Sequence, residues 1–119
     1  MRDSDSSGGQ DPSVAKTWQR VGSSEDFIES EPWPVVLSCG QRVAIVRSQG
    51  KIFGVADQCT HGDARLSDGW AEDGWIECPL HQGRFSLIDG KPLCEPVTEA
   101  VRCFAVREQD GEVWVGGQP

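Results

Sequence analysis

Two short units, Cys59-Thr60-His61 and Cys78-Pro79-Leu80-His81, each place a cysteine close to a histidine. The chain has only two histidines, and each unit contains one of them. Thiolate and imidazole are ligands that iron and zinc accept in proteins. The residue types and their spacing therefore predict a metal site formed by Cys59, His61, Cys78 and His81.

The mixed composition of the two units bears on which metal binds. Structural zinc sites usually present Cys-x-x-Cys knuckles or a cysteine pair with a histidine pair. Here each unit supplies one thiolate and one imidazole, which favours a 2Fe-2S cluster with unequal irons. In that arrangement one iron binds Cys59 and Cys78, and the other binds His61 and His81, as in Rieske centres. A zinc site that stabilises an interaction module is the alternative.

The two units and the residues around them resemble a known family. Cys59-Thr60-His61, with the run Cys-Pro-Leu-His-Gln-Gly-Arg-Phe over 78–85, is similar to the signature of bacterial Rieske-type ferredoxins. These proteins are electron-transfer components of aromatic-ring-hydroxylating dioxygenase systems. The similarity continues through 90–98 and 113–115, so it covers the chain from about Trp18 to Val115.

The resemblance implies a function without catalysis by the chain itself. A one-electron carrier of this kind passes electrons from an NAD(P)H-dependent flavin reductase to a terminal oxygenase in the catabolism of aromatic hydrocarbons. It would be a monomer that docks transiently, with His61 and His81 at the surface and the cysteines facing inward beneath a third loop around Pro96. A small Rieske subunit of a larger reductase, such as nitrite reductase, is the alternative within the same chemistry.

The chain also departs from respiratory Rieske proteins. Where those proteins carry an additional cysteine in each cluster loop, this sequence has Ala64 and Leu80, so no disulfide can join the loops. Where they place a serine and a tyrosine that donate hydrogen bonds to sulfur, this sequence has Gly83 and Phe85. Fewer donors stabilise the reduced state less, which predicts a potential of about −150 mV, at the low end of the Rieske range.

The remaining sequence predicts an all-β fold, a small antiparallel Rieske-like sandwich or barrel with a cluster-binding subdomain of two loops. Residues 1–13 are rich in serine, glycine and aspartate and are expected to be a disordered tail. Residues 14–117 form the predicted domain, and its cluster-binding loops span about 57–85. One helical turn is expected over 23–28. Short apolar runs predict strands near 18–21, 35–37, 42–47, 52–56, 75–77, 84–87, 101–106 and 113–115.

Charge and composition limit the classes of partner. A net charge of −8 and a pI near 4.6 argue against nucleic acid as a partner. No apolar run is long enough to cross a membrane, and the N-terminal residues lack the apolar core of a secretory signal. These features predict a cytoplasmic protein, in which Cys39, Cys94 and Cys103 remain reduced thiols.

Further expectations concern individual side chains. Cys94 and Cys103 are expected to remain free thiols even if adjacent strands bring them close together. The tryptophans at 33, 70, 75 and 114 are expected to pack in the core or under loops. The acidic residues near the two units are expected to be solvated and to steer the carrier toward basic patches on its partners. They are Asp57, Asp63, Asp68, Glu72, Asp73, Glu77 and Glu95.

Overall fold

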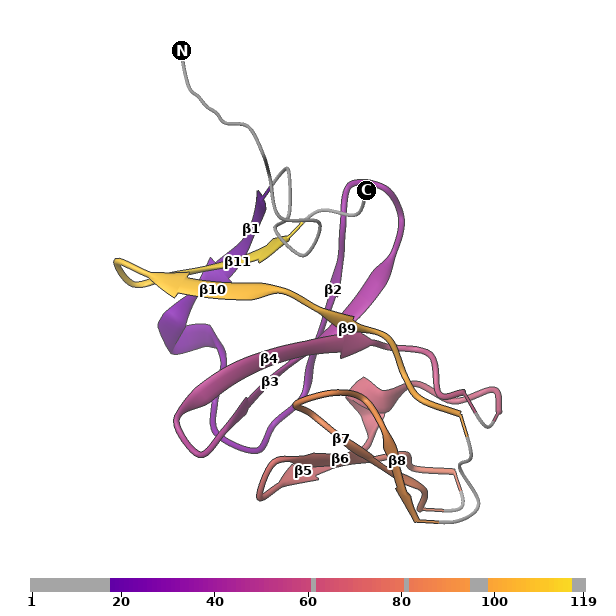
Figure 1. The fold of residues 1–119 in the computed structure, drawn as a ribbon. Coiled ribbons are helices and arrows are strands. Elements are labelled where there is room, and N and C mark those ends of the chain that lie inside the picture. The colour runs from indigo at the N-terminus through magenta and orange to yellow at the C-terminus, as the bar shows by residue number, and fades with distance from the viewer. Residues whose placement is uncertain (1–17, 61, 81, 95–98, 117–119) are drawn as a thin grey trace, which may run out of the picture.

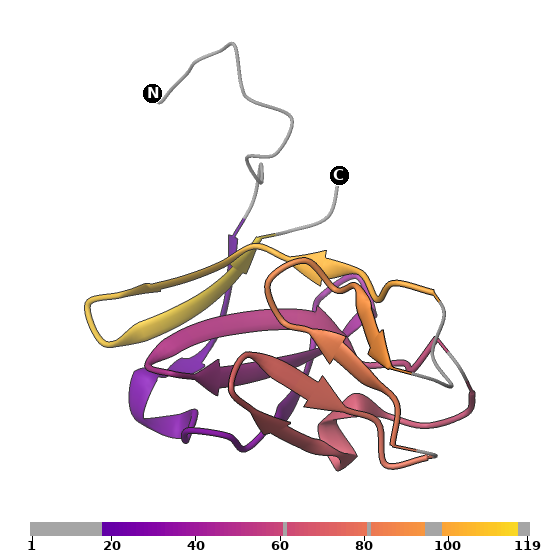
Figure 2. The same ribbon diagram turned by 60° about the horizontal axis from the view of Figure 1, so that its bottom comes forward.

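Three antiparallel β-sheets make up the fold of this computed structural model (Figure 1). The structure describes residues 18–60, 62–80, 82–94 and 99–116. The predicted tail, residues 1–13, lies outside this part of the chain. Figures 1 and 2 show the sheet that contains β3 and β4 between the other two. The all-β prediction is thereby confirmed.

The sheets have the strand orders β1-β11-β10, β2-β3-β4-β9 and β5-β6-β7-β8. Within the described residues the only helical elements are two short 3-10 turns, η2 and η3. The bounds are β1 Trp18–Ser23, η2 Ser24–Asp26, β2 Trp33–Val36, β3 Arg42–Ser48, β4 Lys51–Ala56, η3 Leu66–Asp68, β5 Trp70–Glu72, β6 Trp75–Glu77, β7 Arg84–Ser86, β8 Pro92–Cys94, β9 Cys103–Phe104, β10 Val106–Gln109 and β11 Glu112–Gly116.

Strand β3 lies at the centre of the fold and is buried on both faces. Successive side chains of a strand point to opposite faces. Val43 and Ile45 pack into a core that also contains side chains of β11, whereas Ala44 and Val46 pack into a core shared with β5, β6 and β7. This second core contains both predicted ligand cysteines. The middle sheet therefore packs directly against the two cysteines of the predicted metal site.

Hairpins connect most neighbouring strands, and their turns follow the backbone chemistry expected of them. Gln49 and Gly50 both have positive φ, at 55° and 79°, between β3 and β4. The pairs Asp73-Gly74 and Asp110-Gly111 have the same property in the β5–β6 and β10–β11 turns. Two consecutive positive φ values define the turn that matches the twist of a two-residue hairpin. The strands expected at 42–47 and 52–56 are therefore joined as a hairpin.

Some expectations for strands and tryptophans require correction, whereas the expected helical turn is confirmed. Strands β5 and β8 were not predicted, and the expected strand at 101–106 is instead divided between β9 and β10. The helical turn expected over 23–28 is present as η2, where the Ser23 N–H donates to the Asp26 carboxylate at 2.9 Å. Trp33 and Trp70 do not belong to the core, since 52% and 55% of their surfaces are exposed. Both begin strands at sheet edges, where the outward face meets solvent.

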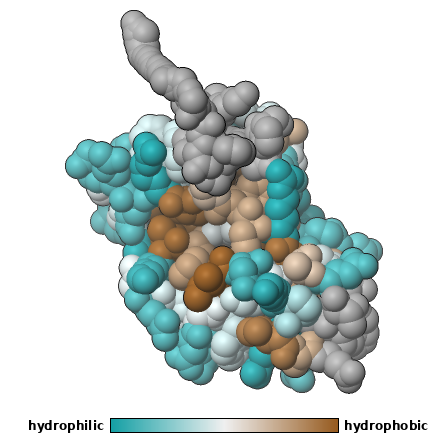
Figure 3. All heavy atoms as spheres, in the orientation of Figure 1, coloured by the Kyte–Doolittle hydropathy of each residue, from teal (hydrophilic) through white to brown (hydrophobic). Residues whose placement is uncertain are grey.

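The face of the protein in Figure 3 carries both hydrophilic and apolar residues. In the orientation of Figure 3, apolar residues form separate patches bordered by polar ones. The large apolar side chains that are exposed are Ile28, Trp33, Val36, Trp70, Leu80, Ile88 and Leu93. No helix in the described part of the chain has the length and hydropathy required to span a bilayer.

Candidate metal centre

Two loops at one end of the molecule carry the predicted cysteine ligands (Figures 1 and 2). Cys59 follows the end of β4, and Cys78 follows β6 directly. The Cys59 N–H donates to the carbonyl of Ala64 at 2.9 Å, and the Cys78 N–H donates to the carbonyl of Gly83 at 2.7 Å. Each cysteine therefore begins a short loop that its own backbone hydrogen bond closes.

The two loops contact one another and a third segment. A Cβ placed on Gly62 would lie 3.1 Å from Cδ2 of Leu80, so the first loop approaches the Leu80 side chain of the second loop closely. The hydroxyl of Thr60 donates to the carbonyl of Glu99 at 2.8 Å. The loop of Cys59 therefore lies against both the second loop and the segment that contains Glu99.

The two thiols meet in the interior. Cys59 is 2% exposed and Cys78 is 0% exposed, and both belong to the core beneath the loops. Burial raises the pKa of the Cys78 thiol to about 11, with a further contribution from its hydrogen bond with Cys59. The Leu80 N–H, at 3.4 Å from the Cys78 sulfur, opposes this rise because it favours the thiolate. Two buried thiols this close would repel as thiolates, so a cation between them is the arrangement that stabilises both charges.

The structure does not cover the other two predicted ligands. His61 and His81 lie outside the described residues, as does the predicted third loop around Pro96. Among the residues that the structure describes, no group of three or more histidine, cysteine, aspartate and glutamate residues is placed to hold a metal ion. The structure thus brings Cys59 and Cys78 together, and the two histidines remain predicted ligands.

Gly83 and Gln82 shape the end of the second loop. Gly83 is buried, and Gln82 beside it has a positive φ of 61°. The carbonyl of Gln82 lies 3.8 Å from the sulfur of Cys94 in β8. This backbone conformation turns the chain sharply after the second ligand unit and returns it to β7.

A further expectation is wrong. Asp57 was expected to be a solvated surface carboxylate, but it is only 1% exposed. Cys94 and Cys103 do not lie on adjacent strands, because β8 pairs with β7 and β9 pairs with β4. Both cysteines are exposed and not disulfide-bonded, as is Cys39.

Sequence reasoning missed the partners of Asp57. Ser67 and Arg42 both contact its carboxylate, from η3 and from the first residue of β3. A signal was present, because an aspartate directly after an apolar strand and two positions before a ligand is placed where burial is possible. Neither Ser67 nor Arg42 has a sequence feature that assigns it to this site.

The fold and the paired thiols define an all-β protein in which two buried cysteines meet where two adjacent loops come together. A family model described as the Rieske 2Fe-2S domain matches residues 17–105, which include all four predicted ligands. The chain belongs to the Rieske 2Fe-2S domain family. The match begins one residue before β1 and ends between β9 and β10.

Known proteins with related sequences are components of dioxygenase systems. The anthranilate 1,2-dioxygenase ferredoxin subunit of Burkholderia cepacia is 44% identical over 99 residues, 82% of this chain and 90% of that protein. The ferredoxin component of the naphthalene 1,2-dioxygenase system of Pseudomonas putida is 38% identical over 98 residues, 82% of this chain and 93% of that protein.

A solved structure of a complex shares the fold. It contains the reduced oxygenase and the oxidized ferredoxin of carbazole 1,9a-dioxygenase, and one of its chains matches with a TM-score of 0.80 at 33% identity. The match covers 85% of this chain and 94% of the other.

Proposed function

We propose that this chain is a one-electron carrier, the ferredoxin component of an aromatic-ring-hydroxylating dioxygenase system. Its cofactor would be one Rieske-type 2Fe-2S cluster bound by Cys59, His61, Cys78 and His81. The observation that carries the proposal is the meeting of Cys59 and Cys78, buried and hydrogen-bonded, at the junction of two loops that each bear one of the chain's histidines. The names of the related proteins support the assignment to a dioxygenase system.

The residues of the chain have distinct parts in this function. When bound, the cluster supplies a centre that gains and loses one electron. The burial of Cys59 and Cys78 excludes water from the side of the site that faces the core. The N–H of Leu80 would donate to the sulfur of Cys78 and stabilise its negative charge. The histidines would leave the other side of the centre accessible to partners.

Transfer requires one electron from a donor and its delivery to an acceptor. We assign these parts to a flavin-containing reductase and to a terminal oxygenase, both in the cytoplasm. Electron-transfer partners of this kind bury less than about 1,200 Å² and dissociate quickly. The net charge of −8 suits basic docking surfaces on both, and the rate of association should then fall as salt screens the attraction.

The first experiment tests the centre. The purified protein should contain iron and acid-labile sulfide, absorb visible light, and give a Rieske EPR signal when it is reduced. Replacing either Cys59 or Cys78 with serine, or either His61 or His81 with alanine, should abolish the signal. Cys94→Ser is the matched control, because this cysteine lies on β8 close to the second loop but outside the ligand set. A colourless protein that contains zinc would contradict the proposal.

The second experiment tests the partners. Reduced protein should transfer one electron to the terminal oxygenase of a naphthalene or anthranilate dioxygenase in stopped-flow mixing, at a rate that decreases with salt. A carrier should also remain a monomer during size-exclusion chromatography. Stable association with a nitrite reductase large subunit, with no transfer to either oxygenase, would favour the reductase-subunit alternative.

A further inference from the structure

Asp57 is the one charged side chain among the buried residues that the structure describes. It lies between the end of β4 and Cys59, and 1% of its surface is exposed. Burial of a carboxylate is costly unless hydrogen bonds and an opposite charge compensate for the lost water. A charged group in this position therefore requires a structural or functional reason.

The contacts of Asp57 close the base of the loop that carries Cys59. Its Oδ1 accepts the Ser67 N–H at 2.7 Å, and its Oδ2 accepts the Ser67 hydroxyl at 3.0 Å. Its backbone carbonyl accepts the Leu66 N–H at 2.7 Å, and its own N–H donates to the carbonyl of Arg42 at 3.2 Å. One residue thus joins β3, the end of β4 and η3 at the point where the cluster loop begins.

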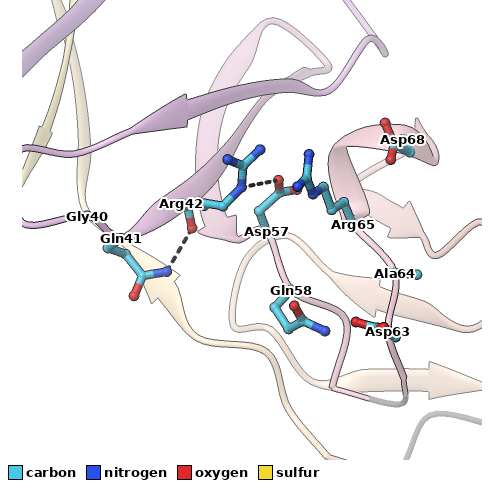
Figure 4. Close-up of a pocket in the computed structure, with 9 residues that line it drawn as sticks. All are labelled: Gly40, Gln41, Arg42, Asp57, Gln58, Asp63, Ala64, Arg65 and Asp68. Atoms are coloured by element: carbon cyan, nitrogen blue, oxygen red, sulfur yellow. Dashed lines mark hydrogen bonds and ion pairs between the residues drawn. The ribbon is translucent and has the colours of Figure 1, made fainter.

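The opposite charge near Asp57 is only partly engaged. The Arg42 Nε lies 3.7 Å from Oδ2 of Asp57, which is an ion-pair distance but too long for a hydrogen bond. This Nε is buried and has no hydrogen-bond partner, although 41% of the Arg42 side chain is exposed. Figure 4 shows the guanidinium pointing to the carboxylate from β3. Arg42 therefore acts on Asp57 as a nearby positive charge and not through a direct hydrogen bond.

Asp57 and Arg42 line a cavity of about 540 Å³, and three other charged side chains line it as well. They are Asp63, Arg65 and Asp68, and all three are exposed. Water screens exposed charges far more than buried ones. Asp57, with Arg42 as its counterion, is therefore the local charge that acts most strongly on the interior side of the loop.

We propose that Asp57 is a positioning residue that holds the Cys59 loop and whose buried negative charge lowers the reduction potential of the centre, with Arg42 acting in the opposite direction. The inference rests on the proposed ligation by Cys59. Two residues span at most about 7 Å of chain, so the carboxylate lies in the same region as the ligand sulfur. Reduction adds one electron from the donor to the centre, and a negative charge nearby opposes that addition.

Three variants of the full-length holoprotein test the proposal. Asp57→Asn removes the charge and retains an oxygen for the Ser67 N–H, so the midpoint potential should shift in the positive direction. Arg42→Gln removes the counterion, so the potential should shift in the negative direction. Ser48→Ala is the matched control, because Ser48 is the other buried polar residue and its hydroxyl binds the Gly74 N–H at 2.8 Å without contributing charge. Its potential should equal that of the wild type.

The midpoint potentials should be measured by spectroelectrochemical titration without any partner protein. Shifts of opposite sign in Asp57→Asn and Arg42→Gln support the proposal. Shifts of the same sign, or unchanged potentials with intact visible spectra, overturn it, because loop distortion would not distinguish the two charges. If Asp57→Asn does not retain a centre, Arg42→Gln decides alone: a negative shift supports the charge effect and no shift overturns it. Failure of the wild type to bind iron would refute the proposed function instead.

Hydrogen exchange tests separately whether Asp57 positions the loop that carries Cys59. In hydrogen exchange, Asp57→Ala should expose the amides of Leu66 and Ser67 much more than Asp57→Asn does. Equal protection of these amides in the two variants would overturn the positioning role.

Discussion

Gly69 lies so close to Glu77 that no side chain can be accommodated between them. A Cβ placed on Gly69 would overlap the carbonyl oxygen of Glu77 and would lie 3.2 Å from the carbonyl oxygen of Leu66. The two residues lie at the edge where β5 begins and β6 ends, and Cys78 follows Glu77 directly. Because Gly69 has no side chain, the carbonyl of Glu77, directly before Cys78, can occupy the space that a Cβ at position 69 would need.

Gly69→Ala should therefore displace the end of β6 and with it Cys78. We expect a loss of about 3 kcal/mol in the free energy of unfolding, the upper part of the range for overpacking, together with reduced iron content. Urea unfolding monitored by tryptophan fluorescence and an iron assay would measure both. Gly50→Ala is the control: its φ of 79° makes alanine unfavourable by about 1 kcal/mol, but its Cβ would meet no atom within 4 Å. The iron content of this control should be normal.

The sequence was sufficient to predict that Cys59 and Cys78 face inward and to predict most of the long strands. Val43–Val46 is apolar without alternation, and this indicates a strand buried on both faces, which is what the two cores on either side of β3 require. The turn at Gln49-Gly50 was recognisable because glycine tolerates the positive φ that a tight hairpin needs.

Short strands and long-range contacts were not predictable in the same way. Strands β5 and β8 are the two edge strands of their sheet, and they form because β6 and β7 provide edges for pairing, which the local sequence does not show. The burial of Asp57 depends on Ser67 and Arg42, which lie ten and fifteen positions away in the chain and meet it only in the folded protein. Local composition around Asp57 is acidic and gives the opposite expectation.

Ser48 fastens the hairpin of β5 and β6 to the middle sheet. Its hydroxyl is the acceptor for the Gly74 N–H, and the side chain is 1% exposed. Ser48→Ala would leave this N–H without its partner, so we expect a loss of about 1–3 kcal/mol in the free energy of unfolding. Ser38→Ala is a suitable control, since Ser38 is exposed and its described hydrogen bond uses only its backbone N–H. Equal unfolding midpoints for the two variants would contradict the role of Ser48.

The five thiols divide into two classes by their exposure to solvent. Cys39, Cys94 and Cys103 are exposed, whereas Cys59 and Cys78 are buried. In the folded holoprotein an aromatic disulfide reagent should therefore react with three thiols, and with five after unfolding and removal of iron. Reaction of more than three thiols before unfolding would show that the ligand cysteines are accessible.

Within the exposed class, Cys103 should react most slowly. Local burial, followed by the charge of Asp89, raises the pKa of its thiol, and the thiolate is the reactive form. Its sulfur would lie 3.2 Å from a Cβ on Gly90, which accounts for local burial in a residue that is exposed as a whole. Asp89→Asn should accelerate the reaction of Cys103 at pH 8 and leave Cys39 unchanged. The Asn side chain retains the oxygen that accepts the Lys91 N–H at 3.0 Å.

Arg47 links the middle sheet to the sheet of β10. Its guanidinium contacts the carboxylate of Glu108 at 2.6 Å and also donates to the carbonyls of Phe27 at 2.8 Å and Ser24 at 3.1 Å. Arg47→Met should lower the free energy of unfolding by about 2–3 kcal/mol, because partly buried carbonyls lose their donors as well as the ion pair. Glu108→Gln should cost less, about 0.5–1 kcal/mol at pH 7, since only the partly exposed pair is weakened.

The effect of Glu108 should depend on pH. The hydrogen bond from Arg47 lowers the pKa of the Glu108 carboxyl, so the folded protein releases this proton more readily than the unfolded chain does. The resulting stabilisation is present above the unfolded pKa, about 4.3, and is lost as pH falls through the lower folded value. The difference in free energy of unfolding between wild type and Glu108→Gln should therefore be constant from pH 7 to 5 and shrink below about pH 4, as measured by urea unfolding of the apoprotein.

Glu112→Gln is the matched control, because Glu112 pairs with Arg20 at 3.2 Å with both side chains more than two-fifths exposed, at 43% and 45%. A constant difference for Glu108→Gln down to pH 3 would show that the ion pair with Arg47 does not contribute to stability.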